Sequence, residues 1–277
     1  MAGTLYVVAT PIGNLEDVTL RALRVLRDVS VIAAEDTRRT ARLLQHYSIS
    51  TRTTSLHAHN EHEKTRALID RLRGGESVAL VSDAGTPLIS DPGHQLVREA
   101  RDAGIRVEAI PGPSAVMAAV SASGWGAEGF TFAGFPPARS KDRNAWFARL
   151  VNIGQLTVLF EAPHRLVRTL NDLSLTFGPE HIVGIGRELT KAHEELVIGP
   201  ISAALARFQE PRGEFTLLIP PLPPREPPDM GPPDPEKLRE ELGRIAKTGG
   251  SGRREAVKLL AAKYGLSANE LYKLLES

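Results

Sequence analysis

Short apolar runs alternate with amphipathic segments over the first 112 residues. The apolar runs have the length and composition of buried strands, and they predict strands at Leu5–Ala9, Val29–Ala34, Val78–Val81 and Ile105–Ile110. Apolar residues at helical spacing predict helices over Val18–Arg27 and Glu63–Leu72. A further helix is predicted from a cap at Asp36 or Thr37 to Leu44, and another follows the turn that ends at Gly93 and stops at Gly104. Repeated strand–helix–strand units indicate a parallel sheet.

The pattern changes after the turn Pro111–Ser114, where we place a hinge between two domains. Beyond it, strands are predicted at Phe130–Ala133, Leu156–Phe160, Ile182–Gly186, Glu195–Ile198 and Phe215–Ile219. Helices are predicted over Ala115–Ser121, Asp142–Leu150, Pro163–Leu175 and Ile201–Phe208. This order favours a second α/β domain with a mixed sheet.

The end of the chain has a different composition. Nine of the sixteen residues from Pro220 to Pro235 are proline, which is typical of an extended, semi-rigid linker. Helices are predicted over Glu236–Lys247, Arg253–Lys263 and Ser267–Leu275, with a helix–turn–helix-like break at Gly265–Ser267. We therefore expect an α/β domain at 1–112, a second at 113–220, a linker at 221–235 and a helical extension at 236–277.

Composition narrows the class of protein. The chain contains no cysteine, which excludes disulfides, thiolate metal sites and cysteine nucleophiles and fits a reducing cytoplasm. Met1–Leu5 leads directly into a strand, and no apolar stretch approaches the roughly 18 residues that cross a membrane. We expect a cytoplasmic protein without membrane association. The net charge is +1, and nine basic and six acidic residues after Pro235 make the tail mildly positive, as a solvated surface commonly is.

The turn Ser82–Gly93 is the strongest candidate for chemistry, because it follows the buried strand Val78–Val81. In an open α/β sheet, ligands bind outside the carboxyl ends of the strands. The turn has neither a G-x-G-x-x-G sequence nor a Walker lysine, and it carries Asp83. It therefore predicts a ligand that is cationic or rich in hydrogen-bond donors, in place of a phosphate.

Other polar turns also follow predicted strands. They are Glu35–Thr40, Pro111–Ser114, Phe160–Arg165 and Arg187–Glu195. Each one alone is explained by helix capping and surface charge. Because they occur in both predicted domains, together they favour one shared cleft.

The segment His57–Glu63 is rich in histidine. His59 and Glu63 would share a helix face if the helix began early, but the segment lacks a complete set of zinc ligands. We favour a polar loop that faces the substrate, with Asn60 as a helix cap and no metal. In the tail, Tyr264 and Tyr272 are too few for a base-stacking platform, so phosphate contact and partner docking both stay open.

These turns occur in a recognisable order: Val8–Asp17, Glu35–Arg38, His59–Glu61, Ser82–Pro87, Pro111–Ala115, Phe160–Arg165 and Arg187–Lys191. In this combination, over about residues 3–220, the chain resembles the bacterial small-subunit (16S) ribosomal RNA methyltransferases that methylate a cytidine ribose 2′-oxygen. That family belongs to the tetrapyrrole-methylase-like group of S-adenosylmethionine enzymes. The tail from Asp234 resembles the helical extension of many members.

The resemblance implies a two-domain, tetrapyrrole-methylase-like α/β fold, a homodimer, and S-adenosyl-L-methionine bound between the domains. It also implies a target in the decoding centre of the assembled small ribosomal subunit. Carried over position by position, the group's cofactor pattern falls on Pro11, Asp83, Ala84, Gly85, Pro87, Ser114, Ala115, Phe160, Ala162, Leu189, Ala192 and Thr216.

This cofactor agrees with the chemistry of the Ser82–Gly93 turn, because it carries a sulfonium and an ammonium but no phosphate. The methyl donor is already activated, so we expect orientation to supply most of the catalysis. The ribose hydroxyl must still lose a proton, and Asp36, His59 and Glu63 are candidate acceptors. RNA phosphates would contact Arg38, Arg165, Arg187 and Lys191, with Asn60 or His164 at a base or sugar.

Two other hypotheses stay open. A tetrapyrrole such as a corrin precursor could be the acceptor, since a macrocycle with several carboxylates also attracts arginines. Alternatively, the chain could be a non-catalytic RNA-binding assembly factor with a vestigial cofactor pocket. The intact Ser82–Pro87 turn argues against this last hypothesis.

Overall fold

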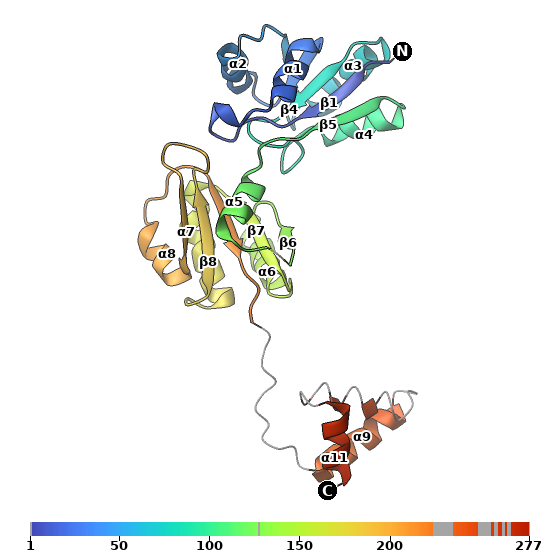
Figure 1. The fold of residues 1–277 in the computed structure, drawn as a ribbon, viewed down its shortest axis with the longest axis vertical. Coiled ribbons are helices and arrows are strands. Elements are labelled where there is room, and N and C mark those ends of the chain that lie inside the picture. The colour runs from blue at the N-terminus through green and yellow to red at the C-terminus, as the bar shows by residue number, and fades with distance from the viewer. Residues whose placement is uncertain are drawn as a thin grey trace. The chain divides into compact units, whose positions relative to one another are not determined.

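The computed structural model describes residues 2–126, 128–223, 235–248, 256–257, 260–261, 264 and 267–276. Contacts within the chain divide it into two compact units, Met1–Pro221 and Leu222–Ser277. In the described residues, the first unit contains two five-stranded sheets with helices against them (Figure 1). No helix in the described part of the chain is long and apolar enough to span a membrane.

The first sheet is parallel and has the strand order β3-β2-β4-β1-β5. Its strands are β1 (Thr4–Val8), β2 (Val31–Ala34), β3 (Thr53–Ser55), β4 (Val78–Val81) and β5 (Arg106–Ile110). The connecting helices are η1 (Leu15–Asp17), α1 (Leu20–Asp28), α2 (Thr37–His46), α3 (Glu61–Arg73) and α4 (His94–Asp102). Every residue of β2 and β4 is buried, as expected for strands covered on both faces.

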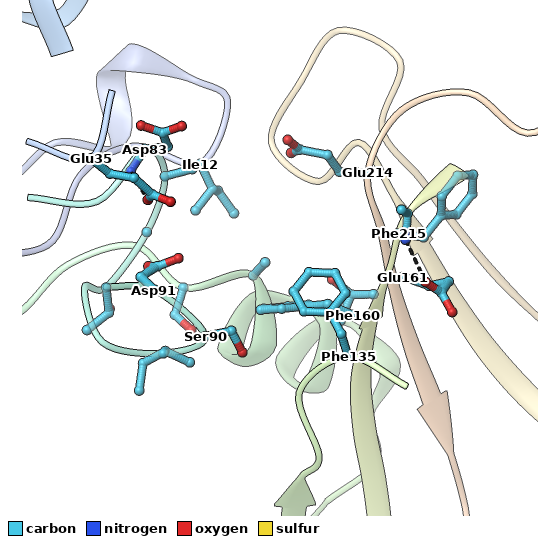
Figure 2. A pocket seen from close by; sticks show the side chains of 18 of the residues that line it. Ile12, Glu35, Asp83, Ser90, Asp91, Phe135, Phe160, Glu161, Glu214 and Phe215 are labelled. Atoms are coloured by element: carbon cyan, nitrogen blue, oxygen red, sulfur yellow. Dashed lines mark hydrogen bonds between the residues drawn. The ribbon is translucent and has the colours of Figure 1, made fainter. Parts of the chain in front are cut away.

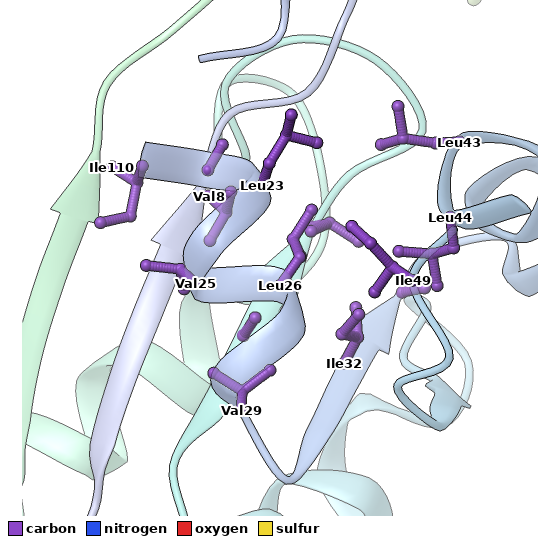
Figure 3. Packing of buried hydrophobic residues seen from close by; sticks show 14 residues of the cluster. Val8, Leu23, Val25, Leu26, Val29, Ile32, Leu43, Leu44, Ile49 and Ile110 are labelled. Carbon is purple, nitrogen blue, oxygen red and sulfur yellow. The ribbon is translucent and has the colours of Figure 1, made fainter. Parts of the chain in front are cut away.

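Successive residues of these strands point into two different cores. Ile32 and Ala34 pack with α1 and α2, and Figure 3 shows Leu23 and Leu26 of α1 directed into this cluster. Val31 and Ala33 belong to the opposite core, which α3 and α4 supply. The alternation follows from the period of two of a strand, and it keeps the sheet buried on both faces.

The second sheet is mixed, with the order β6-β7-β10-β8-β9; β6 and β7 are parallel and the remaining pairs antiparallel. Its strands are β6 (Phe130–Phe132), β7 (Leu156–Glu161), β8 (Ile182–Arg187), β9 (Glu195–Pro200) and β10 (Phe215–Ile219). The helices are α5 (Ala115–Ser123), α6 (Ser140–Leu150), α7 (Pro163–Phe177) and α8 (Ile201–Arg207). A parallel sheet followed by a mixed sheet confirms the predicted fold class.

One apolar cluster joins the two sheets. Val116 and Val120 of α5 pack against Val158 of β7 and Leu218 of β10. Ile12, from the turn after β1, belongs to the same cluster. The two sheets of the first unit therefore share buried surface at their junction.

The second unit has its own small core. Helices α9 (Pro235–Thr248) and α11 (Ala268–Glu276) contribute Leu238, Leu242 and Leu271, which pack with Val257 and Leu260. The guanidinium of Arg239 donates two hydrogen bonds to the carbonyl of Leu275. Most of the predicted linker and parts of the predicted Arg253–Lys263 helix and Gly265–Ser267 break lie outside the described residues. The domain boundaries stay predictions.

Two local differences from the sequence prediction have clear physical causes. The strand β3 was not predicted, because its three residues are polar and pair only at the sheet edge with β2. The helix predicted from Val18 begins instead at Leu20, because the Thr19 hydroxyl accepts a hydrogen bond from the Ala22 amide at 3.0 Å and caps it.

Candidate functional site

The turns after β1 and β4 are held together by an antiparallel bridge. The Thr10 amide donates to the Gly85 carbonyl at 2.9 Å, and the Gly85 amide donates to the Thr10 carbonyl at 3.0 Å. Gly85 has a φ of +82°, and a Cβ there would lie 3.3 Å from the Ile12 side chain. Glycine is therefore favoured at this position by both conformation and space.

The turn between Thr86 and Gly93 has a strained backbone, and its end is bound by a side chain of α3. Leu88 and Ser90 have φ values of 73° and 71°, which are uncommon for residues with a side chain and cluster at functional sites. At the end of the turn, the Glu61 carboxylate accepts hydrogen bonds from the amides of Gly93 and Gln95, at 3.1 and 2.8 Å. Glu61 thereby caps α4 and fixes the turn's exit.

A cavity of about 350 Å³ opens between this turn and the second sheet (Figure 2). One wall carries the carboxylates of Glu35, Asp83 and Asp91. The opposite wall carries Phe135 and Phe160, whose ring centres are 5.6 Å apart. An aromatic wall facing a carboxylate wall suits a ligand with a flat ring at one end and positive charge at the other.

The carboxylates of the first wall perturb one another. Burial raises the pKa of Asp91 to about 6, and the nearby charges of Glu35 and Asp83 add to this effect. Burial also raises the pKa of Glu35. Asp83 accepts a hydrogen bond from the Asp36 amide at 2.9 Å, and its other oxygen lies 3.5 Å from the Arg39 guanidinium. A cation bound here would relieve the repulsion.

A second cavity of about 380 Å³ adjoins the first and has a different character. Both are lined by Ile12, Arg39, Asp83, Ala84 and Glu214. The second is lined in addition by the cationic side chains of Arg42 and Lys191 and by the turn from Thr10 to Gly13. Arg39 and Arg42 are three residues apart on α2, so they lie on the same side of the helix.

The turn after β8 reaches across to the turn after β1. The Asn14 amide donates to the Thr190 hydroxyl at 3.2 Å, and a Cβ on Gly13 would lie 2.3 Å from Cγ of Lys191. Lys191 in turn pairs with Glu188 at 2.8 Å and Glu214 at 2.9 Å. This contact fixes the spacing between the two sheets at the second cavity.

Most residues expected to bind the cofactor do meet at these cavities. Those that line the first cavity are Asp83, Ala84, Gly85, Ser114, Ala115, Phe160, Ala162 and Thr216. Pro11 lines the second. Leu189 is buried in the cluster that contains Ile12 and Phe160, while Pro87 and Ala192 lie outside the described lining of either cavity. The roles themselves stay predictions.

The candidate proton acceptors are not brought together. Asp36 caps α2, and hydrogen bonds from Arg38 hold its pKa well below its usual range, which makes it a weak base. Helix α3 begins at Glu61, two residues before the predicted start, so His59 lies outside it and the condition for His59 and Glu63 to share a helix face is not met. Neither of these two belongs to the described lining of either cavity.

Several expected RNA-binding residues already have partners in the protein. Asn60 was predicted to cap α3, but its side chain makes no capping hydrogen bond. Its side-chain oxygen accepts a hydrogen bond from the His57 amide at 2.8 Å, and its NH₂ group donates to the Ser55 hydroxyl. Arg165 pairs with Glu161, and Arg187 pairs with Glu195 at 2.9 Å. Arg38 is exposed but pairs with Asp36 at 2.8 Å, His164 is exposed, and Lys191 lines the second cavity.

The sequence prediction omitted several lining residues. Glu35, Arg39 and Asp91 lie within turns that were singled out, and their position after a strand could have identified them. Phe135 follows β6 in the same way, but the residues around it, Ala133 to Ala138, are apolar, glycine or proline, so this turn was not singled out. Arg42 and Glu214 carry no local signal. Among the described residues, no group of three or more acidic or histidine side chains is arranged to hold a metal ion.

Comparison with known proteins gives the family. The sequence profile of the Tetrapyrrole (Corrin/Porphyrin) Methylases matches residues 4–205, which include all strands of the first sheet and most of the second. The chain belongs to this family. Uroporphyrin-III-C-methyltransferase from Thermus thermophilus has a similar fold, with a TM-score of 0.55 at 21% identity, over 78% of this chain and 94% of its own.

Two relatives are more similar in sequence, and both are named Ribosomal RNA small subunit methyltransferase I. The protein from Synechocystis sp. is 44% identical over 274 residues, which are 98% of this chain and 97% of the relative. That from Vibrio cholerae is 47% identical over 222 residues, which are 79% of this chain and 77% of the relative. These matches confirm the family resemblance predicted from the turns.

The raised pKa of Asp91 predicts a pH-dependent effect of Asp91→Asn. The folded protein favours the protonated acid, so this group's contribution to stability is present below its ordinary pKa of 3.8 and is lost as the pH rises through about 6. Asp91→Asn should therefore raise Tm more at pH 7.5 than at pH 4.5, measured by thermal unfolding. The exposed Asp70→Asn serves as the control. An Asp91→Asn effect that is equal at the two pH values would contradict the assignment.

The close approach of Gly13 to Lys191 predicts a cost for Gly13→Ala. The added methyl would displace the turn after β8, and we expect a loss of roughly 1–3 kcal/mol in the free energy of unfolding, measured with denaturant. Gly154→Ala is the matched control, because a methyl group added at that position would meet open space. Equal stability of both variants would show that the contact is not tight.

Proposed function

We propose that the protein transfers a methyl group from S-adenosylmethionine to the ribose 2′-oxygen of a cytidine in small-subunit (16S) ribosomal RNA. The observation that carries this proposal is the pair of adjoining cavities, one acidic and aromatic, the other lined by Arg39, Arg42 and Lys191. The two relatives named above support ribosomal RNA of the small subunit as the acceptor. We place the target in the decoding centre of the assembled subunit.

The first cavity fits the methyl donor. When bound, S-adenosylmethionine supplies a methyl group activated by its sulfonium. Phe135 and Phe160 offer an apolar surface to a purine, and the carboxylates of Asp83 and Asp91 face the positive charges. Ser114 and Ala115, at the start of α5, complete the wall between the sheets.

The second cavity fits a segment of RNA. Helix α2 carries Arg38, Arg39 and Arg42 and has no acidic residue within its bounds. Arg38 is 88% exposed, and Arg39 and Arg42 line the cavity. Guanidinium groups in this arrangement position the phosphates of a strand, and the shared wall brings its ribose beside the donor cavity.

Orientation of the two substrates is the main catalytic contribution that we propose. The residues expected to assist, Asp36, His59 and Glu63, stay proposals, and the low pKa of Asp36 makes it the least suited of them as a base. Glu35 is better placed, because it lines the first cavity and burial raises its pKa. We also propose that the protein is a cytoplasmic homodimer.

A tetrapyrrole acceptor is the second candidate. The fold is shared with uroporphyrin-III-C-methyltransferase, and the carboxylates of a macrocycle would also be attracted to Arg39 and Arg42. The sequence identity of this chain is 44% to a ribosomal RNA methyltransferase and 21% to the uroporphyrin enzyme, which favours RNA as the acceptor. A non-catalytic role fits poorly, since the strained turn at Leu88 and Ser90 is retained around an open cavity.

Methyl transfer can be tested with labelled S-adenosylmethionine. We expect label in small subunits from cells that lack the protein, and we expect mass spectrometry of the digested RNA to place it on the 2′-oxygen of one cytidine. Uroporphyrin III, incubated in parallel, should stay unlabelled. Label on a base, or on the macrocycle alone, would contradict the proposed acceptor.

The arginine face of α2 predicts a selective defect in Arg42→Met. Loss of one phosphate contact should raise KM for subunits several-fold and lower the salt dependence of binding, with a slope reduced by about 1, while KM for the donor is unchanged. Arg24→Met, at an exposed position of α1, is the control. An equal rise of both KM values would show that Arg42 does not act on the acceptor.

A further inference from the structure

The segment that joins β6 to α6 places an aromatic side chain on the cavity wall. Its first part extends the sheet, because the Phe160 amide donates to the Gly134 carbonyl at 2.9 Å. At Gly134, with a φ of +68°, the chain turns away from β7. Phe135 follows, is 48% exposed, and faces the donor cavity beside Phe160 (Figure 2).

Three arginines hold the residues after Phe135 through their carbonyl groups. Pro136 and Pro137 have no amide hydrogen, so they cannot be fixed by donors of their own. Arg165 donates to the Pro136 carbonyl, Arg143 to the Pro137 carbonyl at 3.2 Å, and Arg168 to the Ala138 carbonyl at 3.4 Å. These arginines belong to α6 and α7, so side chains from two helices hydrogen-bond to the short segment 136–138.

Two of these arginines, Arg143 and Arg165, are arranged around a buried carboxylate. Glu161, the last residue of β7, has no exposed side-chain surface, and Arg143 is 1% exposed. Glu161 accepts hydrogen bonds from the Thr169 hydroxyl and the Ala162 amide, and it lies 3.3 Å from the Arg165 guanidinium. Arg143 donates to Thr169 at 2.5 Å and also pairs with Asp172.

Such a network is not needed for stability alone. Two buried charges lose their hydration, and apolar residues of the same volume often stabilise a fold as well or better. What the network adds is fixed geometry, because each forked guanidinium group holds two partners at once. Arg165 binds Glu161 and the Pro136 carbonyl. Arg143 binds Thr169, which itself donates to Glu161, and the Pro137 carbonyl.

We propose that Glu161, Arg143 and Arg165 are positioning residues that set the place of Phe135, and that Phe135 closes the aromatic wall against the ring of the bound ligand. The identity of that ring as the purine of S-adenosylmethionine rests on the proposed function. The half-exposed ring of Phe135 then becomes buried when the donor binds, which adds affinity.

A double-mutant cycle tests whether Arg165 acts through Phe135. The variants are Phe135→Ala, Arg165→Met and the double variant, with Arg149→Met on α6 as the exposed control. Calorimetry with S-adenosylmethionine should show affinity about tenfold lower in each single variant and no further loss in the double variant, since both changes remove the same contact. Arg149→Met should bind normally.

Two further measurements separate positioning from stability. Arg165→Lys retains a positive charge beside Glu161 but lacks the fork that reaches Pro136, so Tm should be preserved while affinity stays low. Hydrogen exchange at the amides of Gly134, Phe135 and Ala138, without ligand, should be faster in Arg165→Met than in Arg149→Met.

Additive losses in the double variant would overturn the proposal, and so would normal affinity of Arg165→Met. If the unaltered protein binds no S-adenosylmethionine, the proposed donor is wrong. The exchange measurement then decides the positioning role alone, and unchanged exchange in Arg165→Met would overturn it.

Discussion

The reciprocal hydrogen bonds between Thr10 and Gly85 are the constraint on which the site depends. They join the turns that follow two neighbouring parallel strands, β1 and β4. Ile12, Asp83 and Ala84 are thereby placed between the two cavities and line both of them. A parallel sheet provides this opportunity generally, because its strands all end at one edge; here a backbone bridge makes two of the turns one rigid unit.

The separation of charge between the cavities follows from that unit. Asp83 points its carboxylate at the start of α2, where it binds the Asp36 amide and approaches Arg39. Asp91 and Glu35 line only the first cavity, whereas Arg42 of α2 and Lys191 line only the second, and Arg39 of α2 lines both. A cationic donor and an anionic acceptor can therefore meet at one wall, each beside groups of opposite charge.

The sequence allowed the sheets and most of the turns that line the first cavity to be predicted, for a physical reason. Strands buried on both faces, such as β2 and β4, leave continuous apolar runs, and the turns that follow them must converge. Side-chain partners could not be predicted in the same way. Asn60 precedes α3 and Arg165 lies in the first turn of α7, and only the folded chain shows that the side chain of each is already paired with a neighbour. The position that we propose for Phe135 depends on Arg143 and Arg165, which belong to two later helices and bind the carbonyls of the two residues after it.

The proposed function requires that the cavity between the two sheets holds a cationic methyl donor. The most direct measurement is a crystal structure of the full chain with S-adenosylmethionine. We expect electron density for the donor between Asp83 on one side and Phe160 and Thr216 on the other. Density for the donor at any other place, with this cavity filled only by water, would contradict it.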